Sequence, residues 1–217
     1  MTEVAARKDA VKICGVNTPA AFDAAVEAGA DWIGFVFFPA SPRYVTADQA
    51  AALSARHNGG PRRVGLFVNP TEADIHAVTA TLGLAALQLY GPLDVAAMRQ
   101  RFGLPIWRPV PVSSTIDLPS HDMGADTLLL ESKAPAASSR PGGNAVTFNW
   151  SVLDGWTSPA PWLLAGGLTP ANVAGAIRTA KAEAVDVSSG VETSPGVKDP
   201  EWIRAFIHAA RHAYEPA

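Results

Sequence analysis

The sequence predicts a single (β/α)8 barrel, and three observations support this prediction. Eight short apolar segments alternate with helix-prone segments along 217 residues, which is the repeat count of a small barrel. The length and the apolar content of 48% suit one domain with a full core. Several apolar segments end in glycine, serine or proline, as strands do before a turn into a helix. A doubly wound parallel sheet is the alternative, because periodicity cannot show that a sheet closes.

The expected elements follow one another in chain order. Runs of apolar residues predict eight strands, at residues 11–14, 32–38, 64–68, 86–89, 106–112, 127–130, 162–165 and 185–187. Threonine or aspartate followed by proline is typical of a helix start, and such pairs occur at 18–19, 169–170 and 199–200. Further helices are expected over 46–56, after Thr71 and through 95–98. Pro109 and Pro111 weaken the prediction of the fifth strand, because proline cannot donate to a sheet ladder.

Two segments beside the sixth strand lack a clear helical pattern. Residues 113–124 are expected to be irregular or briefly helical, and residues 132–147 are rich in serine, proline, alanine and glycine. We interpret 132–147 as a mobile loop rather than a linker, because the strand–helix alternation resumes after it with a short helix opening at Asn149. Residues 1–217 are therefore predicted to form one domain, with residues 1–10 as a flexible N-terminal tail.

Composition argues against several classes of function. A net charge of −3 is not the basic footprint of a nucleic-acid-binding protein. The single cysteine, Cys14, rules out an intrachain disulfide and a cysteine-based zinc cluster. The N-terminus lacks an apolar signal segment, and the longest apolar run, 32–38, is too short to cross a bilayer. We expect a cytoplasmic protein without a membrane or nucleic-acid partner, and a monomer, with a homodimer as the alternative.

Small residues end the seventh and eighth strands and predict a phosphate-binding cup. Gly166 and Gly167 follow one strand, and Ser188, Ser189 and Gly190 follow the next. Backbone N–H groups bind anions, and glycine allows a close approach. In barrels of this kind, phosphate is commonly bound by the loops after strands seven and eight. The alternative is that both are ordinary strand-to-helix turns.

Polar residues at other strand ends are the remaining site candidates, because barrel ligands lie at the C-terminal ends of the strands. Cys14 closes the first strand, and it is either a buried small side chain or a thiolate base. Lys12 is expected to face away from Cys14. Glu131 ends the sixth strand, as a solvated carboxylate or as a general acid with a raised pKa. Tyr90 ends the fourth strand.

Two charged residues complete the candidate set. Arg43 follows the second strand, either as a surface loop residue or as a clamp on a substrate carboxylate. Asp186 lies inside the eighth strand, where aspartate is disfavoured, so we expect it to meet a hydrogen-bonding ligand or partner. The five histidines fall mostly on helices or loops, are expected to be solvated, and give no metal-site pattern.

At this point the motifs resemble those of the phosphoribosylanthranilate isomerase family of tryptophan biosynthesis. The matching blocks cover nearly the whole chain in order: VKICG (11–15), GFVFFPASPR (34–43), VGLFVN (64–69), LQLYG (87–91), LLLES (128–132), PGGNAVTFNW (141–150), LAGGLTPANV (164–173) and VDVSSGVETSPGVKD (185–199). The resemblance implies a (β/α)8 barrel that carries out an Amadori rearrangement with no metal or cofactor. The implied substrate is a phosphorylated aminosugar, anthranilate linked to ribose 5-phosphate.

The resemblance also implies residue roles. A general acid at the end of strand six protonates the furanose ring oxygen, and the cysteine of KICG, here Cys14, removes the proton from the second sugar carbon. Arg43 is implied to face the anthranilate carboxylate, and the predicted cup to hold the phosphate. We expect Tyr90 and Asp186 to contact the substrate. The acid position holds Glu131 where the family usually has aspartate.

The chain departs from the family pattern at three further positions. Tyr90 stands where histidine is common, and Ala145 and Asn149 stand where glycine and aspartate are usual. These departures leave two alternatives to an active isomerase. One is a non-catalytic or altered-substrate member of the family that binds a phosphorylated sugar. The other is an isomerase of the histidine-pathway aminoaldose, a class that typically uses aspartates at strands one and five.

Overall fold

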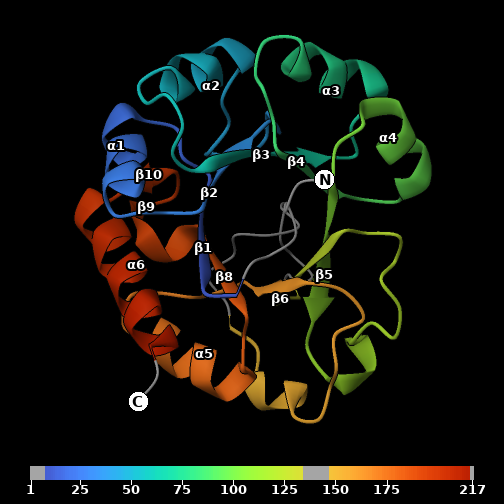
Figure 1. Cartoon of the computed structure of the whole chain (residues 1–217), viewed down its shortest axis with the longest axis vertical. Helices are drawn as coiled ribbons and strands as arrows, with labels where there is room; N and C mark the ends of the chain where they lie inside the picture. The colour runs from blue at the N-terminus through green and yellow to red at the C-terminus, as the bar shows by residue number, and fades with distance from the viewer. Residues whose placement is uncertain (1–7, 134–146, 216–217) are drawn as a thin grey trace.

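The computed structural model describes residues 8–133 and 147–215 and contains a closed barrel of eight parallel strands (Figure 1). The strands follow one another around the barrel in chain order, and β1 (Ala10–Cys14) closes it by pairing with β8 (Ala184–Val187). Helices lie outside the ring of strands (Figure 1). The predicted (β/α)8 barrel is therefore confirmed, and the alternative of an open doubly wound sheet is wrong.

The strands match the apolar runs of the sequence to within two residues at each end. The other six are β2 (Trp32–Val36), β3 (Arg62–Val68), β4 (Ala86–Tyr90), β5 (Ile106–Val112), β6 (Thr127–Ser132) and β7 (Trp162–Leu164). The largest shortening is in β2, whose ladder with β3 ends at the pair Val36–Leu66. Strand β6 runs through Glu131 to Ser132, so the predicted acid lies within a strand rather than after one.

Alternate residues of each strand point into the barrel and build it in layers. The layer at the N-terminal end is apolar and takes one residue from every strand: Ala10, Trp32, Val64, Ala86, Trp107, Leu129, Leu163 and Ala184. Trp32 and Trp107 meet edge to face there, with ring centroids 5.1 Å apart. Positions two and four residues further along each strand face the same interior and form the wall above this floor.

This alternation corrects the expectation for Lys12. Lys12 lies two residues after Ala10 and two before Cys14 on β1, and all three are buried. Its ammonium group binds Gln88 of β4 and Asp186 of β8 across the interior. The expectation that Lys12 faces away from Cys14 is wrong, because residues i and i+2 of a strand share a face.

The helices begin largely where the capping residues predict. They are α1 (Pro19–Glu27), α2 (Ala47–Ser54), α3 (Glu72–Thr79), α4 (Val95–Phe102), α5 (Val173–Ala180) and α6 (Pro200–Tyr214). The side chains of Thr18, Thr71 and Asp199 cap their helices as predicted. Regular helix α5 begins later than expected, because Thr169 and Asn172 each accept a hydrogen bond from the other's backbone amide in a preceding turn.

Short 3₁₀ helices occur within 113–124, which was expected to be irregular or briefly helical, and after Asn149, where a short helix was expected, so both expectations are confirmed. In the described residues, η1 (Thr115–Asp117) lies between β5 and β6, and η2 (Trp150–Leu153) precedes β7. The Asn149 side chain accepts a hydrogen bond from the Ser151 amide, so asparagine caps η2. None of the helices in this part of the chain has the length and apolar character that crossing a bilayer requires.

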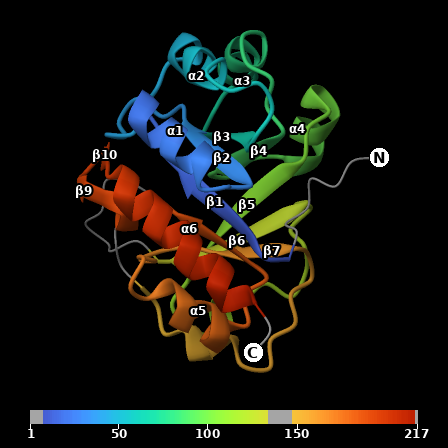
Figure 2. The same ribbon diagram turned by 60° about the vertical axis from the view of Figure 1, so that its left-hand side comes forward.

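A small hairpin between β8 and α6 was not expected from the sequence. It consists of β9 (Glu192–Ser194) and β10 (Val197–Lys198), paired antiparallel. It lies at the N-terminal end of α6, away from the C-terminus of the chain (Figure 2). Its strands are two and three residues long and mostly polar, so no apolar run announces them.

The two prolines of β5 are accommodated by an asymmetry in its pairing. Towards β6 the ladder continues to the pair Val112–Ser132, whereas towards β4 it ends at Gln88–Trp107. Pro109 and Pro111 share one face of the strand and both lack an N–H group, so the donors they remove point to the same neighbour. The early end of the β4–β5 ladder places that neighbour at β4.

Arg108 supplies the donors that the prolines lack. Its Nη1 donates to the carbonyl of Leu89 at 2.8 Å, and its Nη2 donates to the carbonyl of Gly91 at 2.9 Å. These carbonyls lie at the end of β4, beyond the last ladder pair. The guanidinium group therefore continues the β4–β5 connection beside Tyr90.

We expect Arg108→Ala to lower the free energy of unfolding by about 2–3 kcal/mol, because two backbone acceptors lose their charged donor. Chemical denaturation followed by circular dichroism measures the change. Arg101→Ala is the control, because the Arg101–Glu72 ion pair is exposed, and such a pair contributes about 1 kcal/mol at most. Equal, small effects of both substitutions would contradict this role of Arg108.

Candidate active site

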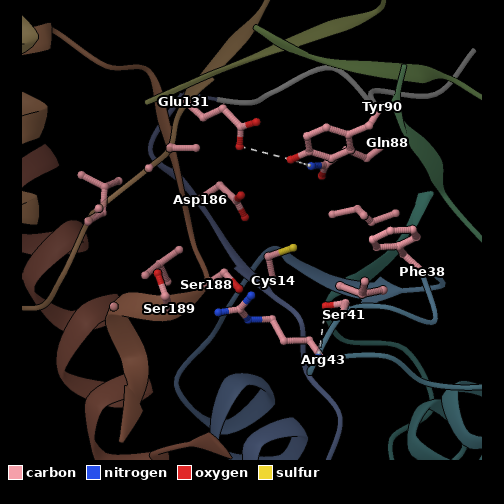
Figure 3. Close-up of a pocket in the computed structure, with 18 of the residues that line it drawn as sticks. Cys14, Phe38, Ser41, Arg43, Gln88, Tyr90, Glu131, Asp186, Ser188 and Ser189 are labelled. Atoms are coloured by element: carbon pink, nitrogen blue, oxygen red, sulfur yellow. Dashed lines mark hydrogen bonds between the residues drawn. The ribbon is translucent and has the colours of Figure 1, made fainter. Parts of the chain in front are cut away.

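The C-terminal ends of the barrel strands surround a cavity of about 710 Å³, counted to its open mouth (Figure 3). Every candidate residue from the sequence lines it: Cys14, Arg43, Tyr90, Glu131, Gly166, Gly167, Asp186, Ser188, Ser189 and Gly190. The structure therefore brings together residues that lie up to 176 positions apart, from Cys14 to Gly190.

Cys14 lies at the end of β1 with its thiol in the cavity (Figure 3). Gly34 on β2 makes room for it, because a Cβ at that position would lie 2.8 Å from the sulfur. Burial raises the pKa of the thiol; the Lys12 ammonium opposes this and the Asp186 carboxylate adds to it, so the pKa stays above its ordinary value. Cys14 is thus a thiol whose anion has an ammonium partner beside it.

Lys12 joins three walls of the barrel. Its Nζ donates to Gln88 Oε1 at 3.0 Å and to Asp186 Oδ1 at 2.9 Å, and its side chain is fully buried. Burial lowers the pKa of Lys12, but Asp186 and Cys14 raise it by more, so the pKa ends above its ordinary value and the group is an ammonium ion. Gln88 was not among the sequence candidates, although it is the inward position two residues before Tyr90.

Glu131 is a buried carboxyl group on the far side of the cavity from Arg43 (Figure 3). Burial raises its pKa to about 8; the hydrogen bond from Tyr90 and the Lys12 charge oppose this shift, and Asp186 adds to it. The Tyr90 hydroxyl donates to Glu131 Oε2 at 3.1 Å. Near neutral pH, Glu131 is therefore largely a protonated acid, as a proton donor must be.

Arg43 is buried and held by Glu192, an acidic residue that was not among the sequence candidates. Its Nε and Nη2 bind the two Glu192 carboxylate oxygens at 2.7 and 2.8 Å. Lys198 binds the same carboxylate at 2.7 Å. Burial raises the pKa of Glu192, but Arg43 and Lys198 lower it by more, and it lies below its ordinary value. Arg43 still lines the cavity, so the hairpin fixes its direction.

The loops after β7 and β8 touch each other at the predicted phosphate cup. A Cβ at Gly190 would lie 1.7 Å from the Leu168 carbonyl oxygen, so only glycine allows this approach. Lys198 donates to the Ser188 carbonyl at 2.9 Å and to its Oγ at 3.3 Å. Burial lowers the pKa of Lys198 to about 8 despite the raising effect of Glu192. The hairpin therefore also braces one wall of the cup.

The remaining expectations concern residues outside the cavity. The five histidines are exposed, in agreement with the expectation that they are solvated. Among residues 8–133 and 147–215, no three His, Cys, Asp or Glu side chains are grouped as metal ligands. Ala145 and most of the loop 132–147 lie outside the described residues. The tail 1–10 is described only from Lys8, and Ala10 already belongs to β1.

A buried acid and a thiol that share one cavity at the C-terminal mouth of a closed barrel define a (β/α)8-barrel protein with an acid–base site. Comparison with known proteins specifies the class. Residues 11–209 match the family model of N-(5'-phosphoribosyl)anthranilate (PRA) isomerase. The chain belongs to the PRA isomerase family.

Individual relatives agree with this assignment. An N-(5'-phosphoribosyl)anthranilate isomerase from Acidiphilium cryptum is 54% identical over 203 residues, which cover 93% of this chain and 98% of the relative. A solved PRA isomerase in complex with reduced 1-(o-carboxyphenylamino)-1-deoxyribulose 5-phosphate has a TM-score of 0.76 and 34% identity, covering 94% and 98%. A structure of monomers made from the dimeric isomerase of Thermotoga maritima has a TM-score of 0.78, 34% identity and the same coverage.

Proposed function

We propose that this chain is an N-(5'-phosphoribosyl)anthranilate isomerase of tryptophan biosynthesis, with Glu131 as general acid and Cys14 as general base. The observation that supports these roles is the placement of a protonated carboxyl and a thiol in one cavity. Both side chains are buried, so an ionisation in this site acts with little screening by water. The reaction interconverts an aldose and a ketose, and its proton transfers use side chains of this chain.

The rearrangement runs in two proton-transfer stages. Glu131 protonates the furanose ring oxygen, the bond from that oxygen to the first sugar carbon breaks, and the ring opens to a Schiff base on the anthranilate nitrogen. The Cys14 thiolate then removes the proton from the second sugar carbon. The enolamine formed gains a proton at the first carbon and loses the proton of the hydroxyl group on the second carbon, which becomes the carbonyl group of the aminoketose. General acid–base steps of this kind contribute about 10²–10⁴-fold each.

The two ends of the substrate match the two ends of the cavity. The phosphate fits the cup formed by Gly166, Gly167 and Ser188–Gly190. Arg43 has Nε and Nη2 engaged by Glu192, which turns its Nη1 edge to the anthranilate carboxylate. Asp186 accepts hydrogen bonds from sugar hydroxyl groups. Tyr90 contacts the substrate beside Glu131, to which it is hydrogen-bonded.

Neither alternative function has a specific observation in its favour. A non-catalytic sugar-phosphate protein would not need a carboxyl group with a pKa near 8 beside a thiol. An isomerase of the other class would need an aspartate on β1 and another on β5. Here β1 ends in Cys14, and β5 contains only apolar residues and Arg108. We propose a cytoplasmic, single-domain enzyme. The monomer stays a prediction, with the homodimer as alternative, and the Thermotoga maritima relative is described as dimeric.

The pH dependence of turnover tests this assignment. The active form carries protonated Glu131 and ionised Cys14, whereas Glu131 loses its proton near pH 8 and the thiol ionises only above its ordinary pKa of about 8.5. The active form is therefore a minority that grows with pH, reaches a plateau above pH 8 and declines once the thiol is ionised.

We expect purified protein to convert freshly generated N-(5'-phosphoribosyl)anthranilate. Log kcat/KM should rise with a slope of about 1 up to a break near pH 8, because kcat/KM reports the free enzyme. A coupled assay that generates the labile substrate in place gives the profile between pH 6 and 10. Absence of turnover would overturn the proposed function, and a pH-independent rate from 6 to 8 would overturn the assignment of the acid and base.

A further inference from the structure

We infer that Gln88 and Tyr90 are positioning residues that decide which oxygen of Glu131 carries the acidic proton. The inference rests on the proposed role of Glu131 as general acid. It comes from a continuous chain of hydrogen bonds that crosses the barrel from β1 to β4 to β6. Two of its members, Tyr90 and Glu131, are joined in Figure 3.

Lys12 sets the donor-to-acceptor direction of this series of hydrogen bonds. An ammonium group can only donate, so the Gln88 atom 3.0 Å from Lys12 Nζ is the carbonyl oxygen Oε1. The amide nitrogen Nε2 then points the other way, and it donates to the Tyr90 hydroxyl at 3.3 Å. Since Asp186 accepts from the same ammonium group at 2.9 Å, Lys12 is held in place from both sides.

Tyr90 continues the series in the same direction and donates to Glu131. Its oxygen accepts a hydrogen bond from Gln88 Nε2, so its own O–H is free to donate, and the acceptor is Glu131 Oε2 at 3.1 Å. Burial and the neighbouring Glu131 raise the pKa of Tyr90 well above its ordinary value, so the hydroxyl keeps this proton. Oε2 is thus the accepting oxygen, and the proton of the neutral carboxyl group resides on Oε1.

The layout of the barrel explains why this bond must come from β4. Strand β5 lies between Tyr90 and Glu131, and at this level it contributes Pro109 and Pro111, whose side chains cannot donate. The tyrosine spans β5 to reach the acid. Glutamate supplies one more methylene than aspartate, and Tyr90 Oη meets the end of this longer side chain. The hydrogen bond therefore confines the acidic proton to one oxygen of Glu131, and that oxygen donates it to the ring oxygen of the sugar.

Tyr90→Phe removes only the hydroxyl group and tests the inference. We expect kcat to fall about 10–100-fold, because the acidic proton is no longer confined to one oxygen, while KM changes less than threefold. The break near pH 8 should move to higher pH, because the lost hydrogen bond had lowered the pKa of Glu131. Tyr44→Phe, at an exposed side chain outside the cavity, should leave both quantities unchanged.

The pH readout concerns every titratable group that faces Glu131. These are Tyr90 on β4, Lys12 on β1 and Asp186 on β8, and Cys14 on β1 acts on Tyr90. Only Tyr90 changes in the variant, and its phenol does not ionise in the range measured. A loss of packing alone would lower the melting temperature without moving the break.

Gln88→Glu gives a second test that keeps the side-chain volume. A carboxylate at this position still accepts from Lys12, but it also accepts from Tyr90, which reverses the donor direction and leaves Glu131 Oε2 without its donor. We expect kcat to fall about as much as in Tyr90→Phe, about 10–100-fold. The kcat of the double variant should lie within about twofold of that of the slower single variant, because both substitutions break the same series of hydrogen bonds.

The outcomes separate the inference from the proposed function. If wild type is active, Glu131→Gln is inactive and Tyr90→Phe keeps the wild-type kcat and break, then Glu131 is the acid and the positioning inference is overturned. Additive losses in the double variant would also overturn it. If wild type itself does not turn over the substrate, the proposed function fails first.

Discussion

Cys14→Ser is expected to reduce kcat by about 10³-fold or more. A serine hydroxyl does not ionise near neutral pH, so the general base is lost while the shape of the side chain is nearly kept. Lys12 stays beside the position, but it is a donor and cannot remove a proton. The coupled assay measures the change, with the slope of the profile below pH 8 as a second readout.

Binding should be almost unaffected by this substitution. The predicted phosphate cup and Arg43 lie on other loops, so the dissociation constant of reduced 1-(o-carboxyphenylamino)-1-deoxyribulose 5-phosphate, the reduced product, should change less than threefold. Retention of more than a tenth of the wild-type kcat would show that Cys14 is only a buried small side chain.

Glu131→Gln is expected to lower kcat by about 10²–10⁴-fold. The amide has the same size and still accepts from Tyr90, but it cannot release a proton to the furanose ring oxygen. The break near pH 8 should disappear from the profile, because the group responsible for it is gone. Steady-state kinetics from pH 6 to 10 on the folded variant checks both expectations.

Glu131→Asp tests whether the length of the acid side chain matters, because it keeps the carboxyl group and removes one methylene. The shorter carboxyl group retracts by roughly one bond and loses the 3.1 Å contact with Tyr90. A misplacement of about 1 Å can cost on the order of a hundredfold, so we expect intermediate activity. An aspartate variant faster than wild type would mean that the site is not adapted to the longer acid.

The fold was largely predictable, because the barrel is built from a repeated local pattern. Buried parallel strands consist of near-continuous apolar runs, and Thr-Pro and Asp-Pro pairs mark where helices start. Strand β5 was the weak prediction, since the donors missing at its prolines are replaced by Arg108, through contacts to β4 that no local pattern shows. The β9–β10 hairpin was missed for a different reason, because short polar strands carry no periodic signal.

The site was predictable where function depends on a residue at a strand end, and not where it depends on partners across the barrel. Cys14 and Glu131 follow or end apolar runs, so position alone made them candidates. Lys12 was expected on the wrong face of its strand, although it lies two residues from Cys14 and residues two apart share a face. Gln88 and Glu192 depend on Lys12 and Arg43, which lie 76 and 149 residues away in the sequence, and pairings of that separation require the closed barrel.

The measurement that tests the central claim most directly compares turnover with binding in wild type and Glu131→Gln. The claim is that one cavity both holds the phosphorylated aminosugar and supplies its proton from Glu131. We predict that both proteins bind the reduced product with similar dissociation constants, and that only wild type converts freshly generated substrate efficiently. Equal turnover by the two proteins, or a wild type that binds the reduced product without converting the substrate, would contradict the account.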